Sequence, residues 1–441
     1  MGKLTRNRMA RTTEVPHIAI ERHELANGLR VVLSPDHRAP ILAVNLWYRV
    51  GSGHEKPGAT GFAHLFEHLM FQGSANVAKG EHFRLMEASG GKANASTSWD
   101  RTNYFERMPS HQLELALWLE ADRLASLLPA MTQDKLDNQR EVVKNERRRN
   151  VDNAPYGTWM EHLQTLIFPE GHPYQHPLFG SMEDLDTASL AEVSDFFAAH
   201  YAPNNAVLSI AGDVDPLTAL SLVERYLGPI PANRGVAPAL STAIQATFGT
   251  ELRKTVVDRV PLPRLYAACR SPAFGTPAFD SLQVAMDLLA SGRASRLYRA
   301  LVRELRVAQD VSTFAFPDLG DGAVLVVSVT ARPGVRHEVV ERAMRSELDR
   351  LGAEGPRDEE LERVRNLYAA GVESELQLVN ERADRLSKYT SLFDEPGRIN
   401  SEVERYVSVD SARVREALAT SWRPDNRVLL TYLPVDDPGK A

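Results

Sequence analysis

Two histidines four residues apart, His64 and His68, are the residues of this sequence whose types and spacing are most suited to chemistry. Glu67 stands one residue before the second histidine, which gives the order H-x-x-E-H. On a helix the three side chains lie on one face, because positions three and four apart are neighbours there. Two neutral imidazoles are good zinc ligands, and an adjacent carboxylate can accept a proton from water that the metal has made acidic. The pattern therefore predicts a zinc hydrolase site. The chain has 13 histidines, so a chance pair beside an ordinary solvated glutamate is the alternative.

A carboxylate further along the chain is a candidate for a third ligand. Residues 134–150 form a predicted helix that is strongly charged and has few apolar residues. Glu146 follows Val142 and Val143 by four and three residues, so we expect it to share their buried face. A buried carboxylate requires a partner, and a metal ion is one. A plain surface glutamate is the other interpretation.

Length and composition narrow the class of protein. With 441 residues the chain is long enough for two or more domains with ample cores. A net charge of −7 and the lack of a basic tract argue against a nucleic-acid partner. Cys269 is the single cysteine, which excludes an internal disulfide framework and a cysteine-rich metal site. Any zinc must therefore be held by histidine and carboxylate.

The hydropathy pattern bears on location. No stretch approaches the roughly 18 apolar residues of a membrane-spanning helix, so no membrane span is expected. Residues 1–16 are basic but contain no apolar run that could form the core of a signal peptide. We therefore expect a cytoplasmic protein, or a periplasmic one if the natural N-terminus is longer.

The elements around the motif predict a sheet covered by helices. Residues 21–33 look like a hairpin and residues 41–50 like a strand, and the motif helix is expected to end near Gly73. Residues 92–107 are polar and aromatic, which predicts a strand at a sheet edge rather than in its centre. Such an edge can pair with another chain, whereas the alternative is a solvated hairpin. Helices are predicted at residues 111–128 and 134–150.

The second half of the chain repeats this order. It has an extended segment at 255–269, a helix at 280–289, two strands within 311–330, and helices at 338–351 and 358–377. The sequence APNNAVL at 202–208 is echoed by RPDNRVL at 423–429, each between a helix and a closing strand. We therefore predict an α+β fold of two homologous domains, 1–228 and 248–441, joined by a Pro- and Gly-rich linker at 229–247 and related by internal duplication. Each domain is expected to be a mostly antiparallel sheet with helices packed on it. The second has no histidine at the place of the motif, where residues 283–289 stand.

Together these segments resemble the pitrilysin-type zinc peptidases, the inverzincin family that includes insulysin and the mitochondrial processing peptidase. The resemblance covers almost the whole chain. It is found in the segments LANGL at 25–29, GSGHE at 51–55, HLFEHLMFQGS at 64–74, NA at 94–95 with Thr97, VVKNE at 142–146, YAPNN at 201–205 and SRLY at 295–298.

The resemblance implies roles for individual residues. His64 and His68 would hold one Zn²⁺ per chain, Glu67 would be the general base, and Glu146, 78 residues after His68, would be the third protein ligand. Glu141 is a rival outside the V-V-x-x-E pattern. The resemblance also implies that Asn94, Ala95 and Thr97 bind the substrate backbone by strand addition. Gln139 stands where several members have a further glutamate, so a supporting negative charge is missing there.

The function implied is that of a zinc metalloendopeptidase acting on short or unfolded peptides. Some family members place an Arg and Tyr pair from the C-terminal domain over the substrate, and residues 318–330 offer no counterpart. Two-domain members commonly pair, so a homodimer or a heterodimer with a related subunit is expected. The alternative is a non-catalytic or partner-dependent scaffold subunit, although such subunits tend to lose the motif.

Overall fold

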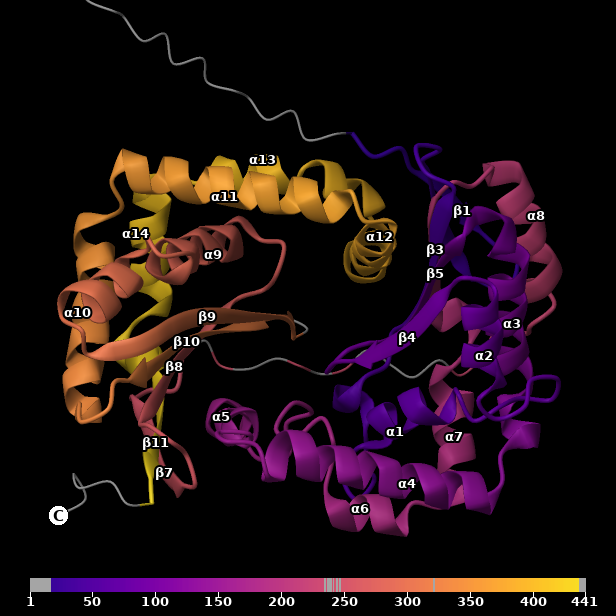
Figure 1. The fold of residues 1–441 in the computed structure, drawn as a ribbon, viewed down its shortest axis with the longest axis horizontal. Coiled ribbons are helices and arrows are strands. Elements are labelled where there is room, and N and C mark those ends of the chain that lie inside the picture. Colours follow the sequence, from indigo (N-terminus) through magenta and orange to yellow (C-terminus); the bar gives the residue numbers. More distant parts are fainter. Residues whose placement is uncertain are drawn as a thin grey trace, which may run out of the picture.

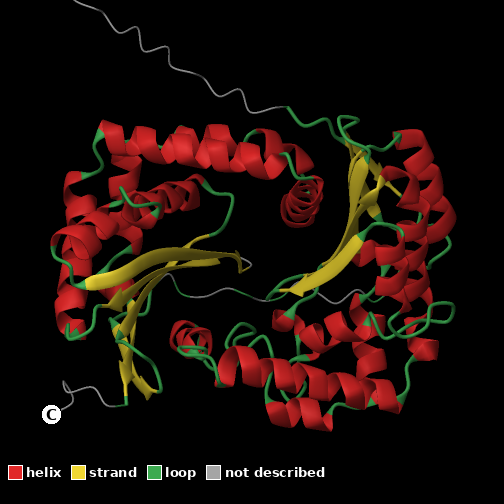
Figure 2. Ribbon diagram, viewed as in Figure 1, coloured by secondary structure: helices red, strands yellow, loops and turns green. Residues whose placement is uncertain are grey.

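The chain folds around two β-sheets, each packed against helices (Figure 1, Figure 2). The structure is a computed structural model and describes residues 17–233, 235, 240, 242, 245, 247–319 and 322–435. The basic N-terminal segment, Gly320 and Asp321, and much of the predicted linker lie outside the described residues. The predicted α+β class is confirmed.

The first sheet has six strands and presents one open edge beside the motif. Strands β3 and β6 lie in its middle and are almost wholly buried, because the sheet is covered on both faces. All its neighbouring strands pair antiparallel except β2 and β6. In order across the sheet the strands are β1 (Glu21–Glu24), β2 (Arg30–Pro35), β6 (Ala206–Gly212), β3 (Ile41–Tyr48), β5 (Thr102–Pro109) and β4 (Lys92–Thr97).

For residues 92–107, the prediction of one strand is wrong, whereas the prediction of a sheet edge is confirmed for the first part of the segment. The segment is a hairpin of β4 and β5, with its turn at residues 98–101. Strand β5 lies inside the sheet despite its polarity, because its polar side chains find partners there. The Thr102 hydroxyl donates to the Val50 carbonyl, and the Asn103 amide donates to Asp384. Strand β4 lies at the sheet edge, as predicted.

The second sheet repeats the core of the first. In each half the closing strand, β6 or β11, pairs parallel with one early strand and antiparallel with the next. This shared topology is what internal duplication predicts. In order the strands are β7 (Leu252–Asp258), β11 (Val428–Pro434), β8 (Arg264–Pro272), β10 (Gly322–Ala331) and β9 (Ala308–Leu319).

In both halves a helix follows the early strands, and further helices precede the closing strand. The first half contains α1 (Phe62–Leu69), α2 (Glu81–Ala88), α3 (Leu113–Ala130), α4 (Gln133–Arg147), α5 (Trp159–Ile167), α6 (Met182–Thr187), α7 (Leu190–His200) and α8 (Pro216–Leu227). The second contains α9 (Pro277–Ala290), α10 (His337–Glu354), α11 (Asp358–Leu376), α12 (Val379–Phe393), α13 (Glu402–Val407) and α14 (Ser411–Ser421).

One helix of each half also packs on the sheet of the other half. Helix α12 packs on β3 and β6, on the face of the first sheet opposite α3 and α8 (Figure 1). Its Arg382 guanidinium lies 2.6 Å from an oxygen of Asp36, and its Leu386 packs in one apolar cluster with Val207. Helix α5 packs in return against β11, where Leu163 shares a cluster with Leu430. The two halves are therefore held together by buried apolar contacts and by polar bonds.

Candidate metal centre and the open sheet edge

Helix α1 carries the motif and is held at its N-terminus by a buried carboxylate. Glu55 accepts hydrogen bonds from the backbone N–H groups of Gly61 and Ala63, each at 2.7 Å, and its side chain is fully buried. These are two of the N–H groups that a helix start leaves unpaired. Burial raises the pKa of Glu55, and the two N–H groups oppose that rise.

The start of α1 also requires a glycine. Gly61 has φ +89, and a Cβ there would lie 2.5 Å from the carbonyl oxygen of Phe179. From this start the helix turns Leu65, Phe66 and Leu69 into the core, where each is 0% exposed. The histidines consequently face the other way, toward α4.

His64, His68 and Glu146 come together where α1 contacts α4. One ligand atom from each residue lies within 4.8 Å of the others. Glu146 Oε2 lies 3.2 Å from His68 Nε2 and 3.9 Å from His64 Nε2. His64 is 7% exposed, and its Nδ1 is buried with no hydrogen-bond partner among the described residues. Burial, with a smaller contribution from His68, lowers the pKa of His64 to about 3, so this imidazole is neutral.

This donor set fits zinc. Two imidazole nitrogens and one carboxylate oxygen are the ligands that zinc takes in one class of catalytic site, in which a fourth position stays open. The three side chains converge without any lysine or arginine between them among the described residues. The residues present could therefore hold one zinc ion and still leave room for a reacting molecule.

The environment of Glu146 corrects one expectation. Val143 is 0% exposed, but Val142 is 40% exposed. The two valines do not share a buried face, because successive residues on a helix are about 100° apart and the buried face of α4 at this point includes only Val143. Glu146 is itself partly exposed, with 26% of its side chain accessible.

The neighbouring candidates on α4 have other partners. Glu141 is 59% exposed in its side chain and pairs with Lys144 at 3.0 Å, away from the histidines. Gln139 is buried, and its amide donates to Asn138. Neither side chain belongs to the group of converging ligand atoms.

Glu67 connects the motif helix to the open sheet edge. Its Oε2 accepts a hydrogen bond from the Thr97 hydroxyl at 2.5 Å. Burial raises the pKa of Glu67, while the Thr97 hydroxyl and His68 act against that rise. A carboxylate with a raised pKa is easier to protonate, which suits a group that must accept a proton and give it back.

The register of the hairpin shows which backbone groups of β4 face the open edge. The Ser98 N–H donates to the Arg101 carbonyl, and the pairing continues from Thr97 opposite Thr102 to Lys92 opposite Arg107. Hydrogen-bonded and non-hydrogen-bonded pairs alternate along an antiparallel ladder. The backbone N–H and C=O groups of Ala93, Ala95 and Thr97 therefore point to the open edge.

Two of the predicted binding residues, Ala95 and Thr97, thus face that edge with their backbones. Asn94 does not, because its backbone is turned to β5, and only its exposed side chain is available. Sequence reasoning missed Ala93, which alternation along a correctly paired hairpin would have revealed. The capping role of Glu55, within the GSGHE segment, was likewise not predicted from the sequence.

A second group of possible ligand atoms is a buried charge cluster. His82, Glu106 and Glu120 lie close together beneath β5, and all three are buried. Arg123 already supplies a positive charge there: it hydrogen-bonds to Glu120 and lies 3.7 Å from Glu106. Its guanidinium also lies 4.3 Å from the centre of the Tyr104 ring. This cluster is therefore a buried ion pair network, and we assign no metal to it.

Comparison with known proteins places the chain in a family. The family model described as insulinase (peptidase family M16) matches residues 30–178, and the model described as peptidase M16 inactive domain matches residues 187–368. Together they cover most of the chain, which belongs to the M16, or pitrilysin-type, family. The predicted family is confirmed.

The relatives include proteins named as proteases and a subunit of a complex. A Helicobacter pylori protein named zinc protease PqqE is 27% identical over 383 residues, which are 86% of this chain and 82% of that protein. A crystal structure of a protease from Helicobacter pylori has a TM-score of 0.88 and 25% identity, covering 95% of this chain and 100% of the other. The human cytochrome b-c1 complex subunit 1 is 28% identical over 266 residues, 60% of this chain and 54% of that subunit.

The helices also bear on the expectation about membranes. None of the helices in the part of the chain that the structure describes is long and apolar enough to cross a membrane.

Proposed function

We propose that the chain is a zinc-dependent metalloendopeptidase that hydrolyses peptide bonds in short or unfolded peptides. The observation that carries this proposal is the convergence of His64, His68 and Glu146 beside Glu67, which is itself bonded to Thr97 on an open sheet edge. Ligands, general base and a strand able to bind peptide thus meet within one small region.

The residues of the chain divide the chemistry between them. His64, His68 and Glu146 would hold one zinc ion, which when bound polarises carbonyl groups and makes a neighbouring water more acidic. Glu67 accepts the proton of the attacking water and returns it to the departing amine. Its bond to Thr97 holds the carboxylate at the junction of α1 and β4 during both transfers.

Strand β4 selects the substrate by its backbone. Ala93, Ala95 and Thr97 present N–H and C=O groups to which an extended peptide can add as a further strand. A peptide bound in this way must be extended over several residues. Short or unfolded peptides meet this condition, whereas a segment within a folded domain does not.

The test is the variant Glu67→Gln, compared with the native chain for zinc content and for cleavage of a quenched peptide library. The amide preserves the shape but cannot accept the proton, so cleavage should fall by about 10² to 10⁴-fold. Zinc content should stay at one per chain. Cleavage at the native rate would overturn the role of Glu67, and a zinc-free native chain would overturn the metal site.

A second candidate function is that of a non-catalytic or partner-dependent subunit, favoured by the similarity to a subunit of the cytochrome b-c1 complex. The chain would then pair with itself or with a related subunit that completes the site. Size-exclusion chromatography with cleavage assays on the same fractions separates the two candidates. Full activity in the monomer fraction contradicts the need for a partner, and cleavage only in a dimer fraction supports it.

A further inference from the structure

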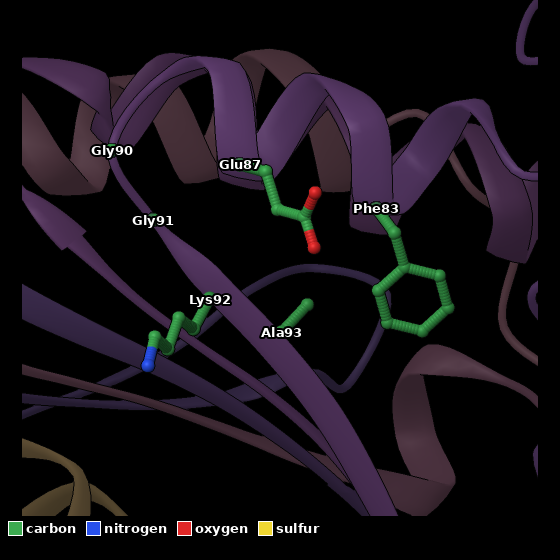
Figure 3. A pocket seen from close by; sticks show the side chains of 6 residues that line it. All are labelled: Phe83, Glu87, Gly90, Gly91, Lys92 and Ala93. Atoms are coloured by element: carbon green, nitrogen blue, oxygen red, sulfur yellow. The ribbon is translucent and has the colours of Figure 1, made fainter.

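A hollow of about 500 Å³ lies beside the open edge of β4, between that strand and α2 (Figure 3). Helix α2 contributes an aromatic ring and a carboxylate, and the start of the strand forms the opposite wall. The residues that line it are Phe83, Glu87, Gly90, Gly91, Lys92 and Ala93.

The register of β4 joins this hollow to the candidate site. Side chains alternate between the two faces of a strand, so Ala93, Ala95 and Thr97 share the face on which Thr97 meets Glu67. A peptide added to the edge would place the side chain opposite Ala93 on that same face. This position lies four residues from Thr97, about 13 Å at the rise of a β-strand.

The charges around the hollow favour a cation. Glu87 is exposed, and its carboxylate extends from α2 toward β4 (Figure 3). Lys92 is on the rim, but its side chain points away from Glu87 (Figure 3). It lies on the other face of the hairpin with Arg107, its partner in the register. Arg84, on the same helix, pairs with Glu81 at 2.7 Å. Glu87 therefore faces the hollow without a lysine or arginine partner among the described residues.

The apolar wall suits the stem of a long side chain. Phe83 is half-buried, and its ring stacks on Phe71, with the ring centres 4.5 Å apart. An aromatic surface that is fixed on one face can pack against methylene groups or a cation on the other. Lysine and arginine combine such a stem with a charged end.

We propose that this hollow is a specificity subsite for a lysine or arginine side chain of the bound peptide, with its stem on Phe83 and its charge at Glu87. The proposal rests on the proposed function, because it takes β4 as the strand that binds substrate. Antiparallel strand pairs are the more common kind, and in that direction the peptide runs from Thr97 toward Lys92. The basic residue then lies a few residues to the C-terminal side of the cleaved bond.

The test measures binding and cleavage separately. Labelled nine-residue peptides carry lysine, norleucine or glutamate at each position in turn, and their affinities for the Glu67→Gln chain are measured by fluorescence anisotropy. Norleucine has the lysine stem without its charge. At one position lysine should bind about fivefold more tightly than norleucine, the size expected of one partly exposed ion pair. Mass spectrometry of the native chain's products locates that position relative to the cleaved bond.

Variants in the Glu67→Gln background assign the preference to its residues. Glu87→Gln should abolish the difference between lysine and norleucine, and Glu87→Lys should shift the preference to glutamate. Phe83→Ala should weaken the binding of the lysine and norleucine peptides to the same extent. Glu224→Gln is the matched control, because Glu224 is an exposed glutamate on the distant helix α8, and it should leave the preference unchanged.

The outcomes distinguish the subsite from the proposed function. A preference that depends on Glu87, in a chain whose native form cleaves nothing, would sustain the subsite and overturn the peptidase. Cleavage without any such preference would overturn the subsite alone. A lysine preference that survives Glu87→Gln, or a failure of every peptide to bind, would also overturn the subsite.

Discussion

Two equivalent helix contacts show how one scaffold can either offer ligands to a metal ion or lack them. They are the contact of α1 with α4 in the first half and of α9 with α11 in the second. His68 stands five residues before Gly73, and Asp287 stands five residues before Gly292. One helical turn earlier are His64 and Gln283. Both helices therefore present a pair of polar side chains at the same spacing.

The two pairs of side chains differ in the hydrogen bonds that surrounding residues make to them. Asp287 accepts hydrogen bonds from the hydroxyls of Tyr406 at 2.7 Å and Ser291 at 2.6 Å, and from the Gln283 amide at 3.4 Å. The imidazole of His64 has a buried nitrogen with no partner among the described residues.

The facing helices differ in the same sense. On α4, Glu146 stands ten residues after the buried Leu136, while on α11 Gly371 stands ten residues after the buried Leu361. In the second half, hydroxyl groups of the same half therefore donate hydrogen bonds to Asp287, and α11 has no carboxylate at the position that corresponds to Glu146. Two imidazole nitrogens that converge with a carboxylate from the facing helix are what distinguish the candidate metal site from its copy.

The largest effect on stability is expected where the first half buries charge beneath β5. Replacing Arg123 by methionine leaves the carboxyl groups of Glu106 and Glu120 buried without the cation that they share. Removing one partner of such a buried pair costs about 3–5 kcal/mol of unfolding free energy. Denaturant unfolding, followed by circular dichroism, measures this loss.

The matched control for Arg123→Met is Arg225→Met. Arg225 pairs with Glu114 on the surface, where the two side chains are 68% and 53% exposed. An exposed pair of this kind contributes less than about 1 kcal/mol. Equal losses in the two variants would show that burial does not set the strength of these pairs.

A smaller effect is expected on metal affinity when the first half is made more like the second. Glu146→Gln removes the carboxylate that α11 lacks. Zinc affinity should fall by at least about 100-fold, because even residues that only support a ligand contribute 10 to 100-fold. Competition with a chromophoric chelator measures the affinity. Glu141→Gln, on the same helix, is the control and should leave it unchanged; a loss there instead would transfer the ligand role to Glu141.

Much of this comparison could be anticipated from the sequence. The H-x-x-E-H order, the echo of 202–208 in 423–429 and the spacing of Glu146 from His68 predicted a helix with candidate ligands in one half only. The first two features are local, because each depends on a short segment, whereas the spacing of Glu146 carried meaning only through the resemblance to the pitrilysin-type family.

Features that depend on distant contacts could not be anticipated. The polarity of β5 concealed an internal strand, because the partner of Asn103 is Asp384 on a helix 281 residues away. The exchange of α5 and α12 between the sheets has no local signal. The opposite environments of Val142 and Val143 depend on how α4 is rotated against α1, which only packing decides.

A smaller effect on stability is expected when the hydrogen bond from Tyr406 to Asp287 in the second half is removed. Tyr406→Phe keeps the ring, which stacks on Tyr368 with centres 3.7 Å apart, and removes the hydroxyl that donates to Asp287. The loss of one such hydrogen bond should cost about 1 kcal/mol of unfolding free energy. Zinc content should not change, since the first half is untouched. A change in zinc content would contradict the expectation that the contact of α9 with α11 does not influence the candidate metal site.

The last contrast lies in how pH acts on one buried Arg–Glu pair in each half. Burial raises the pKa of Glu120 to about 8, above its ordinary 4.5, although Arg123 opposes the rise. For Glu360 burial acts in the same direction, but hydrogen bonds from Arg296 and from the Arg357 backbone prevail and lower its pKa from 4.5 to about 2.

The two glutamates should therefore give opposite slopes of stability in different pH ranges. A folded-state pKa below the unfolded value means that the contribution of Glu360 is present above pH 4.5 and is lost as pH falls from 4.5 toward 2. A raised pKa means that the folded state holds the proton of Glu120, so its contribution is lost as pH rises from 4.5 toward 8. Unfolding midpoints measured from pH 3 to 8 should show Glu360→Gln flattening the acid slope and Glu120→Gln flattening the neutral one. If both variants changed the same slope, the two buried pairs would be electrostatically alike, and the halves would differ only at their metal-facing helices.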